Sequence, residues 1–355
     1  MENLVKLEPE SKAMIHFVLQ KLGRVVLILL AVALLTFLLM HVIPGNPWNN
    51  YSPTTRMMYN LYIDQGTQRQ LDKHFGLDQP LWRQFVGYII GDFEEDGAFR
   101  CGALCGNLGP SIRQRGRMVQ AVFFEPPEGR TFWQSRFGYS IRLVSFGFLI
   151  AVGLGIPLGI WSAATKKNGV SRFISVGLAG LISIPNFVLG LLAIIVVASW
   201  LKIIQVIPNW DEPSNWIIPA VVLAVAPMAS LARVTQASIK NTLNEDYVRT
   251  AHAKGLKQSR VMIGHVLRNA LVPILTYMGT TLMEMLVGLF IVEKLYSFPG
   301  LGHEYWEAVL ELDYPMIMGL TLFYAGGMLL IHMVIEIGCA FLDPRIRSVE
   351  EGVAA

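Results

Sequence analysis

Charged residues are scarce in this chain of 355 residues: Asp, Glu, Lys and Arg make up 15% of it, and hydrophobic residues 53%. A soluble domain averages about 25% charged residues, and the mean hydropathy of this chain is +0.46. The scarcity of charge argues against a soluble protein. The formal net charge of +3 is also too small to indicate a nucleic-acid-binding protein.

The short motifs that carry catalysis or nucleotide binding are missing as well. The sequence has no G-x-x-x-x-G-K-[ST] loop, no H-E-x-x-H and no G-x-S-x-G. We therefore expect no catalytic residue, no metal site and no cofactor in this chain.

Cysteine is rare, with three residues in all. Cys101 and Cys105 lie in the stretch CGALC, and Cys339 lies near the end of the chain. A C-x3-C pair on the oxidising side of a membrane can close a small disulfide loop. The pattern fits a disulfide and two free thiols equally well. A metal site is the weakest interpretation, because the nearest histidine, His74, is far away in the sequence.

Long uncharged or nearly uncharged runs are what the sequence has instead. A helix that spans a bilayer needs about 20 largely apolar residues. Six runs approach or exceed that length, at residues 25–43, 143–164, 173–201, 216–232, 270–292 and 315–342. Strand-like alternation is absent from them. We predict an all-α membrane protein with six transmembrane helices.

The first run, residues 25–43, follows a polar segment at residues 1–24. A cleaved signal peptide is the alternative, but the run exceeds the usual apolar region of 7–15 residues and no small-x-small site follows it. We interpret it as the first transmembrane helix. A large loop at residues 44–140 separates it from the remaining spans, which form a core at residues 141–342, and the chain ends in a tail at residues 343–355.

The distribution of Lys and Arg predicts the orientation of these spans. Basic residues gather in the N-terminal segment, in the loop at residues 166–172, in the stretch at residues 233–269 and in the tail, whereas the two short loops on the other side hold only Lys202 and Lys294. We expect both termini in the cytoplasm. The loop at residues 44–140 is then extracytoplasmic, since long loops translocate largely regardless of charge.

Glycines within two of the runs suit close helix packing. They are Gly153, Gly155 and Gly159 in the second run and Gly326 and Gly327 in the sixth.

Ionisable residues inside the runs are few, and each is a functional hypothesis by default. His332 and Glu336 share a helix face at spacing i, i+4, and we favour structural pairing over a proton relay. Glu284 lies near mid-span, where a lone carboxylate costs at least about 2.5–3.5 kcal/mol. It should therefore face an aqueous cavity or a partner. Glu284 is the main candidate for the translocation pathway, together with Pro185 and Asn186, where a proline interrupts the third run.

A polar segment at residues 241–270 separates the fourth and fifth runs. Its sequence predicts a helix of about ten residues, with Asn244 as N-cap, acidic Glu245 and Asp246 in the first turn, Lys254 in the last turn and Gly255 at C′. Ser259 is expected to begin a second helix that runs toward Pro273.

The first of these helices is expected to place Tyr247, Val248 and Ala251 on one face. The small side chains of Ala251 and Ala253 would let another protein approach the backbone closely. Two interpretations stay open on these residues alone: the helix fills a groove on a partner protein, or it lies on lipid headgroups.

Six stretches of the sequence help to identify a family. The segment DYVRTAHAKGLKQSRVMIGHVLRNALVP resembles the cytoplasmic coupling segment of ABC importer permeases of the dipeptide, oligopeptide and nickel type. The other stretches that resemble this family are PGNP, HFGLDQPLWRQFVGYIIGD, LISIPNFVLGLL, YSFPGLGHEYWEAVLELDYP and FLDPRIR. Together they cover nearly the whole chain.

The resemblance implies a permease that forms the pathway for di- or oligopeptides in the cytoplasmic membrane of a bacterium or archaeon. It implies a second, homologous permease, two ABC ATPases that bind ATP and Mg, and an external substrate-binding protein. A nickel or other chelate importer of the same family is the alternative. An ion-coupled secondary transporter is the rival from another class, but it would need coupling residues at mid-membrane, which are nearly missing here.

The resemblance also implies which residues contact the ATPase. On the family pattern E-A-A-x3-G, Arg249 stands where the Glu is expected, so this chain departs from the pattern at its first position. The residues implied by position are Asp246, Tyr247, Thr250, Ala251, Ala253, Lys254 and Gly255.

An apparent insertion, EEDGAFRCGALCG, also departs from the family and lies in the expected external loop. We hypothesise that this element lengthens the external part of the protein and contacts the binding protein.

Deletion of residues 94–105 is therefore expected to weaken docking of the binding protein while assembly with the ATPases stays intact. Docking affinity measured on the purified complex tests this. An unchanged affinity would rule out a role for the insertion in docking.

Overall fold

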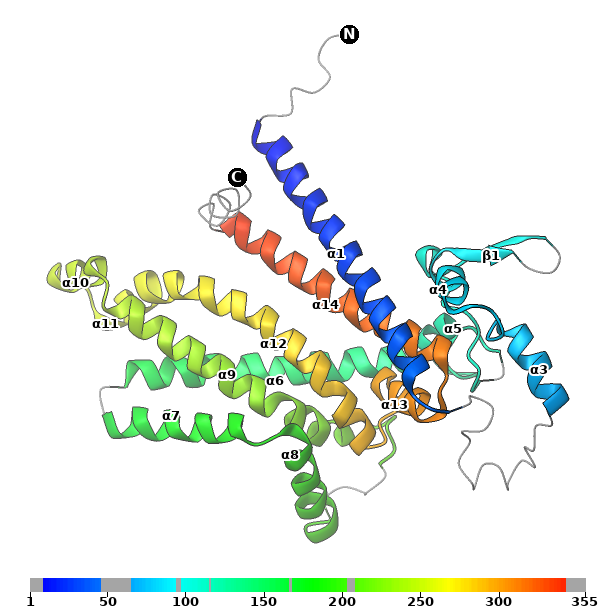
Figure 1. The fold of residues 1–355 in the computed structure, drawn as a ribbon. Helices are drawn as coiled ribbons and strands as arrows, with labels where there is room; N and C mark the ends of the chain where they lie inside the picture. The colour runs from blue at the N-terminus through cyan, green and yellow to red at the C-terminus, as the bar shows by residue number, and fades with distance from the viewer. Residues whose placement is uncertain are drawn as a thin grey trace. The chain divides into compact units, whose positions relative to one another are not determined.

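A computed structural model describes residues 9–45, 65–93, 97–114, 116–165, 168–202 and 208–342, and most of them are helical (Figure 1). The chain divides into two compact units. Unit 1 comprises Met1–Tyr139 and Pro299–Gly327, and unit 2 comprises Ser140–Phe298 and Met328–Ala355. The expected tail at residues 343–355 lies outside the described residues.

Five described helices are long and apolar enough to cross a membrane, and a bent pair of helices adds a sixth if the pair counts as one span. The predicted helical membrane protein is thus confirmed. The helices concerned are α1 (Pro9–Val42), α6 (Arg136–Ala164), α9 (Ile217–Leu243), α12 (Arg268–Leu295), α14 (Tyr314–Leu342) and the pair α7 (Asn168–Ser183) and α8 (Asn186–Ala193), the latter continued by the π-helix η3 (Ile194–Trp200).

The third span is not the single run that the sequence predicts. The segments Gly169–Ser183 and Asn186–Trp200 meet at 93°. Pro185 causes the break, because proline has no N–H to donate and disfavours helical geometry in the residue before it. The carbonyl of Pro185 then accepts a hydrogen bond from Val188 N (2.9 Å) and begins α8.

The fourth and fifth spans are longer than the sequence predicts. Helix α9 continues past Ala232 to Leu243, so Arg233 lies within the helix. The fifth span begins at Gln258, where α11 (Gln258–Val261) and the π-helix η5 (Met262–Leu267) run into α12. No Gly or Pro lies between Arg233 and Leu243, so the helical hydrogen bonds of α9 continue through this polar stretch.

Of the three glycines of α6 that were predicted to pack closely, two bring this helix close to α9. A Cβ on Gly155 would lie 2.8 Å from the Met228 carbonyl oxygen, and one on Gly159 would lie 2.5 Å from that of Ala232. Close packing is thus confirmed for these two. It is wrong for Gly153 and Gly327, where an added Cβ meets no described atom within 4 Å.

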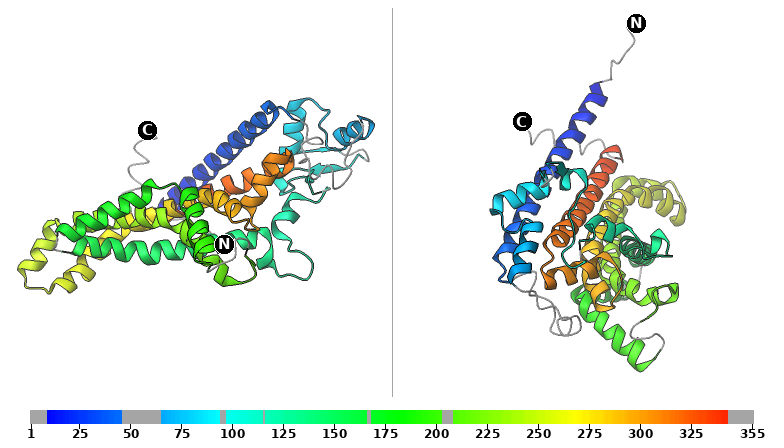
Figure 2. Two further views of the ribbon diagram at one scale, coloured as in Figure 1. Left: turned by 90° about the horizontal axis from the view of Figure 1, so that it is seen from below. Right: turned by 90° about the vertical axis from the view of Figure 1, so that its right-hand side faces the viewer.

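A polar cluster joins α6, α7 and α9 inside unit 2. Gln236 of α9 donates through Nε2 to the hydroxyls of Ser162 (2.6 Å), Ser171 (3.2 Å) and Ser175 (3.1 Å). Such bonds hold membrane helices together, because the interior of a bilayer offers a polar group no other partner. The four long helices of unit 2 therefore run side by side, whereas α8 departs from them (Figures 1 and 2).

Unit 1 contains α1, the segment between α1 and α6, and the first half of α14. The His41 ring, at the end of α1, stacks on Tyr314 at the start of α14, with ring centroids 5.3 Å apart. The other elements of this unit are α3 (Gln65–His74), α4 (Leu81–Ile89), β1 (Gly91–Phe93), β2 (Phe99–Cys101), η1 (Ala103–Cys105), α5 (Val119–Phe124), η2 (Phe132–Gln134) and α13 (Leu301–Glu311). Strands β1 and β2 pair as an antiparallel hairpin, with Asp92 opposite Arg100.

Gly159 and Gly153 of α6 provide a matched test of the packing against α9. Gly159→Ala is expected to lower the free energy of unfolding by about 1–3 kcal/mol, because the new methyl group overlaps the α9 backbone. Gly153→Ala should leave stability unchanged or raise it, since alanine favours a helix. Thermal unfolding of both variants in detergent tests this. Equal destabilisation by the two substitutions would contradict the packing seen here.

Candidate functional site

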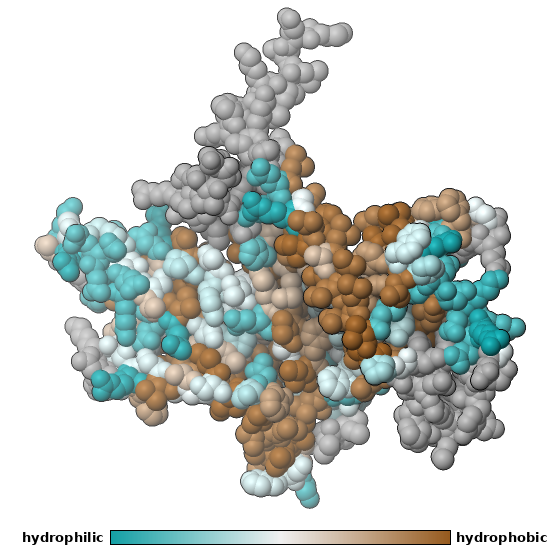
Figure 3. Space-filling view, viewed as in Figure 1, coloured by the Kyte–Doolittle hydropathy of each residue, from teal (hydrophilic) through white to brown (hydrophobic). Residues whose placement is uncertain are grey.

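The segment predicted to couple to a partner forms helix α10 (Asp246–Ala253), which connects α9 to α11. In Figure 3, hydrophilic residues cover the end of unit 2 at which α10 lies. The helix itself is short, and an isolated helix of this length is unstable in water. Contacts with the rest of unit 2 must therefore hold it in place.

One face of α10 supplies those contacts. Val248 and Ala251 are buried in a cluster that also holds Ile239 of α9, Val266 of η5 and Ala270 of α12. Positions i and i+3 lie on the same side of a helix, so Val248 and Ala251 anchor α10 as a pair. Burial of these apolar groups fixes the helix against the ends of the two spans that flank it.

The C-terminal end of α10 is closed by Gly255, as the sequence predicts for the C′ position. Gly255 has φ = +76°, which is unfavourable for residues with a side chain. The Leu256 N–H donates to the Ala251 carbonyl (3.4 Å), and the Leu256 side chain packs on the same cluster as Val248. This combination is the Schellman arrangement, and it turns the chain sharply from α10 into α11.

Two details of the prediction for this segment are wrong. Asn244 does not cap α10, because its N–H bonds back to Asn241 O and it ends α9. Ala251 does not present a small surface to a partner, because it is one of the two residues that face inward. Position in the sequence could not distinguish these roles, since the inward face of α10 is decided by where the α9–α12 pair lies.

The outward face of α10 is polar and accessible. Tyr247 is partly fixed there, because its hydroxyl accepts a hydrogen bond from Asn269 Nδ2 (2.7 Å), at the start of α12. Six of the seven residues expected to contact an ATPase are exposed: Asp246, Tyr247, Thr250, Ala253, Lys254 and Gly255.

The candidate pathway residues lie where α8 meets α12. An added Cβ on Gly288 of α12 would lie 3.1 Å from Asn186 Nδ2. The Oδ1 atom of Asn186 is buried without a hydrogen-bond partner. Tyr296, just after α12, donates its hydroxyl to Gly190 O of α8 (3.2 Å). The α8 segment is thus held against α12 at both ends, while Pro185 stays exposed at the bend.

Glu284 lies one helical turn before Gly288 and therefore on the same side of α12. Its side chain is exposed, and its Oε1 accepts a hydrogen bond from the Tyr277 hydroxyl (3.5 Å). Ser230 and Arg233 of α9 are close enough to Tyr277 to interact with its hydroxyl. An arginine of α9 and a carboxylate of α12 thus both interact with one tyrosine. Arg233 was not predicted here, because the uncharged run ends just before it.

The contacts of the described residues do not test the predicted pairing of His332 with Glu336. His332 is exposed on α14, and the side chain of Glu336 lies outside the described residues. Their pairing stays a prediction.

Unit 1 contains a second polar centre, around Asp313, that sequence patterns did not indicate. The Asp313 carboxylate is buried and accepts from Ser111 Oγ (2.5 Å), Ile112 N (3.2 Å), Arg113 N (3.0 Å) and Met316 N (3.3 Å). The bond from Met316 caps α14. Burial raises the pKa of Asp313, an effect that these hydrogen bonds partly offset.

Glu304 of α13 extends this centre. It is buried, and its carboxylate pairs with Arg113 Nη1 (2.7 Å) and Arg136 Nη2 (2.9 Å) and accepts from Gln114 Nε2 (2.7 Å). Arg113 also pairs with Glu311 (2.9 Å). These residues are up to about 190 positions apart, so no local pattern could reveal them. They fasten the segment around residues 111–114 to α13 and α14.

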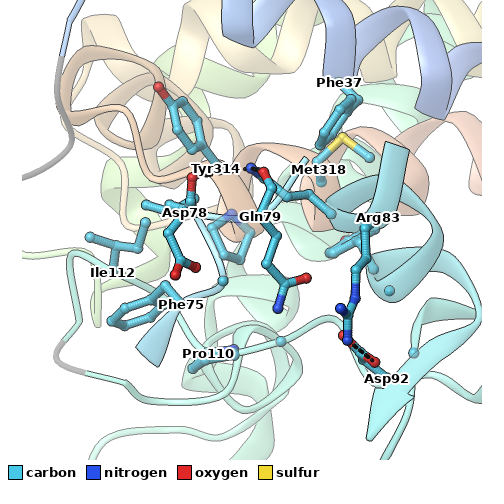
Figure 4. Close-up of a pocket in the computed structure, with 18 of the residues that line it drawn as sticks. Phe37, Phe75, Asp78, Gln79, Arg83, Asp92, Pro110, Ile112, Tyr314 and Met318 are labelled. Atoms are coloured by element: carbon cyan, nitrogen blue, oxygen red, sulfur yellow. Dashed lines mark hydrogen bonds and ion pairs between the residues drawn. The ribbon is translucent and has the colours of Figure 1, made fainter. Parts of the chain in front are cut away.

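A cavity of 1110 Å³ lies in unit 1 between the end of α1, α4 and the start of α14 (Figure 4). Phe37 and Met318 supply apolar lining, and the ion pair of Arg83 with Asp92 (3.5 Å) lies at another side of it. Tyr88 also lines the cavity, and its hydroxyl is buried without a hydrogen-bond partner. Cys101 also lines the cavity, and a disulfide joins it to Cys105.

Comparison with known proteins identifies the family. The family described as "Binding-protein-dependent transport system inner membrane component" matches residues 155–348, and its N-terminal counterpart matches residues 14–128. The dipeptide transport system permease protein DppB of Bacillus subtilis is 33% identical over 96% of this chain and 100% of its own length.

Two further relatives have different names. The oligopeptide transport system permease protein AppB of Bacillus subtilis is 30% identical over 90% of this chain and 95% of its own length. The glutathione transport system permease protein GsiC of Escherichia coli O6:H1 is 31% identical over 94% of this chain and 99% of its own length. The chain therefore belongs to the inner-membrane components of binding-protein-dependent transport systems, the multi-pass permease subunits of ABC importers, which are not themselves enzymes.

Proposed function

We propose that this chain forms part of the translocation pathway of an ATP-driven importer of di- or oligopeptides, and that an external binding protein delivers the peptide. The names of the relatives support the substrate class, since they transport dipeptides, oligopeptides and glutathione, itself a short peptide. The observation that carries the mechanism is the construction of α10. It is a rigid, short helix with a buried apolar face and an exposed polar face.

In this proposal the exposed face of α10 docks into a groove on a cytoplasmic ABC ATPase. A second, homologous permease would present its own helix to a second ATPase. ATP and Mg would bind to those ATPases and not to this chain. Since Gly255 turns α10 directly into α11, and α11 continues into α12, a displacement of α10 would move the whole span from Gln258 to Leu295.

The orientation follows from this docking. The basic residues around α10, among them Arg249, Lys254 and Lys257, suit the cytoplasmic side. With α10 in the cytoplasm, both chain termini are cytoplasmic and unit 1 holds the extracytoplasmic segment between α1 and α6.

The pathway itself would lie along the side of α12 that carries Glu284. Glu284 and Arg233 are exposed beside the half-buried Tyr277 and would otherwise face lipid, which is costly for charged groups. We propose that an aqueous pathway shared with the second permease covers them. Asn186 at the bend of the third span would offer its unpartnered Oδ1 to a peptide N–H.

Gly255 provides the sharpest test of coupling. In complexes purified through this chain, Gly255→Val is expected to abolish peptide-stimulated ATP hydrolysis while membrane insertion is normal, because a β-branched residue is strained at φ = +76°. Gly255→Asn is the matched control, since asparagine tolerates this conformation, and it should retain most of the activity.

The same preparation tests the class of transporter. The wild-type complex should contain two ATPases, a second permease and an external binding protein. Normal stimulated hydrolysis in Gly255→Val would show that another segment does the coupling. Purification without any ATPase would instead reject the importer itself.

The pathway proposal predicts accessibility at position 284. In a Cys339→Ser background, Glu284→Cys should react with a membrane-impermeant maleimide, because a water-filled pathway admits the reagent. Leu149→Cys is the control: Leu149 is 68% exposed on α6 and apolar, so it should face lipid and stay unlabelled. Equal labelling of both positions, or none at 284, would contradict an aqueous pathway along α12.

A further inference from the structure

Helix α4 lies beside the outer part of α1 within unit 1 (Figures 1 and 2). The Phe85 ring of α4 contacts the Phe37 ring of α1, with centroids 5.4 Å apart. Phe37 lies five residues before the end of α1 at Val42, about 7.5 Å along the helix axis. The contact thus places α4 alongside the last turns of a membrane span and not beyond its end.

The level of the membrane surface in unit 1 can be located independently. The stacked rings of His41 and Tyr314 mark the point where α1 ends and α14 begins. The span Leu19–Val42 has 24 residues, about 36 Å of helix, whereas the hydrocarbon core is about 30 Å thick. When this span is centred in the bilayer, only about two residues extend past the core at each end. Phe37, and with it Phe85, therefore lies at the depth of the outer hydrocarbon boundary.

One flank of α4, beside the side that contacts α1, is apolar and exposed. Trp82, Val86 and Ile90 follow one another at spacing i, i+4, so they form one stripe, and they are 69%, 41% and 50% exposed. Phe85 and Ile89, by contrast, point inward. Figure 3 shows hydrophobic surface over α4. A helix of a water-exposed loop normally carries polar residues on this side.

We propose that α4 is an interfacial helix embedded in the outer leaflet of the membrane, with the stripe Trp82, Val86 and Ile90 in contact with lipid acyl chains. Tryptophan is enriched at this depth of a bilayer because its ring is apolar and its N–H reaches the headgroups. Leu35 and Leu39 of α1, on the side of that helix away from Phe37, are exposed as well.

The depth of α4 favours lipid over a protein partner. A water-soluble binding protein docks above the headgroups, whereas the Phe37–Phe85 contact holds α4 at the edge of the hydrocarbon. An amphipathic helix at that depth gains free energy in proportion to the apolar area that it buries in lipid. α4 would thereby tie the extracytoplasmic segment of this permease to the bilayer surface and limit how far that segment moves.

Spin-label accessibility measures this depth directly. The full chain, in a Cys339→Ser background, is reconstituted in nanodiscs of phosphatidylethanolamine and phosphatidylglycerol and labelled at Val86→Cys or, on the same stripe, at Ile90→Cys. Both labels should collide several-fold more often with oxygen, which concentrates in lipid, than with a water-soluble nickel chelate. Asp78→Cys, exposed in the turn before α4, is the control and should show the opposite preference.

Three results would overturn the proposal. Preference for the nickel chelate at positions 86 and 90 would mean that the stripe faces water. Low accessibility to both reagents at these positions would mean that protein, and not lipid, covers the stripe. Addition of an external binding protein should leave the oxygen preference at position 86 unchanged, and its loss would identify the stripe as a protein-docking surface instead.

Discussion

The packing of α9 against α12 is the constraint on which unit 2 depends. Inside a bilayer, apolar side chains gain nothing by leaving lipid for another helix, so close approach and polar contacts decide which helices associate. Ser238 Oγ of α9 donates to Ala270 O of α12 (3.0 Å), next to the cluster that buries Val248 of α10. The same pair of helices thus anchors α10 at one end. Farther along α12, Gly288 lies against Asn186 of the broken span.

This arrangement gives α10 and the candidate pathway a common mechanical basis. A helix moves as a unit because each turn is bonded to the next, and α12 is continuous with α11. The one departure from α-helical geometry in that span is η5, and π-helical turns often occur at functional sites. Force on α10 would therefore reach Glu284 without passing through a loop.

Unit 1 depends on buried charge instead of close helix packing. Glu304 and Asp313 are buried carboxylates, and removal of either would leave arginines or backbone N–H groups without partners. The free energy lost in this way exceeds the net free energy that the bonds contribute to stability. These bonds fasten the segment around Ser111 to α13 and α14. Together with the rings of Phe37 and Phe85, they hold the segment between α1 and α6 close to the end of α1 and the start of α14.

The sequence by itself determined the features that depend on neighbouring residues. Six apolar runs are long enough to cross a bilayer whatever surrounds them, and Gly255 permits a positive φ because it has no side chain, so the spans and the end of α10 were predictable. Only the tertiary structure decided that Ala251 faces inward, that the third span bends by 93° and that Asp313 binds Ser111. Pro185 marks the break in the third span locally, but its angle depends on how α8 packs against α12. The burial of Ala251 and the bond of Asp313 to Ser111 likewise depend on other segments, and a local pattern carries no information about which distant surface a side chain will meet.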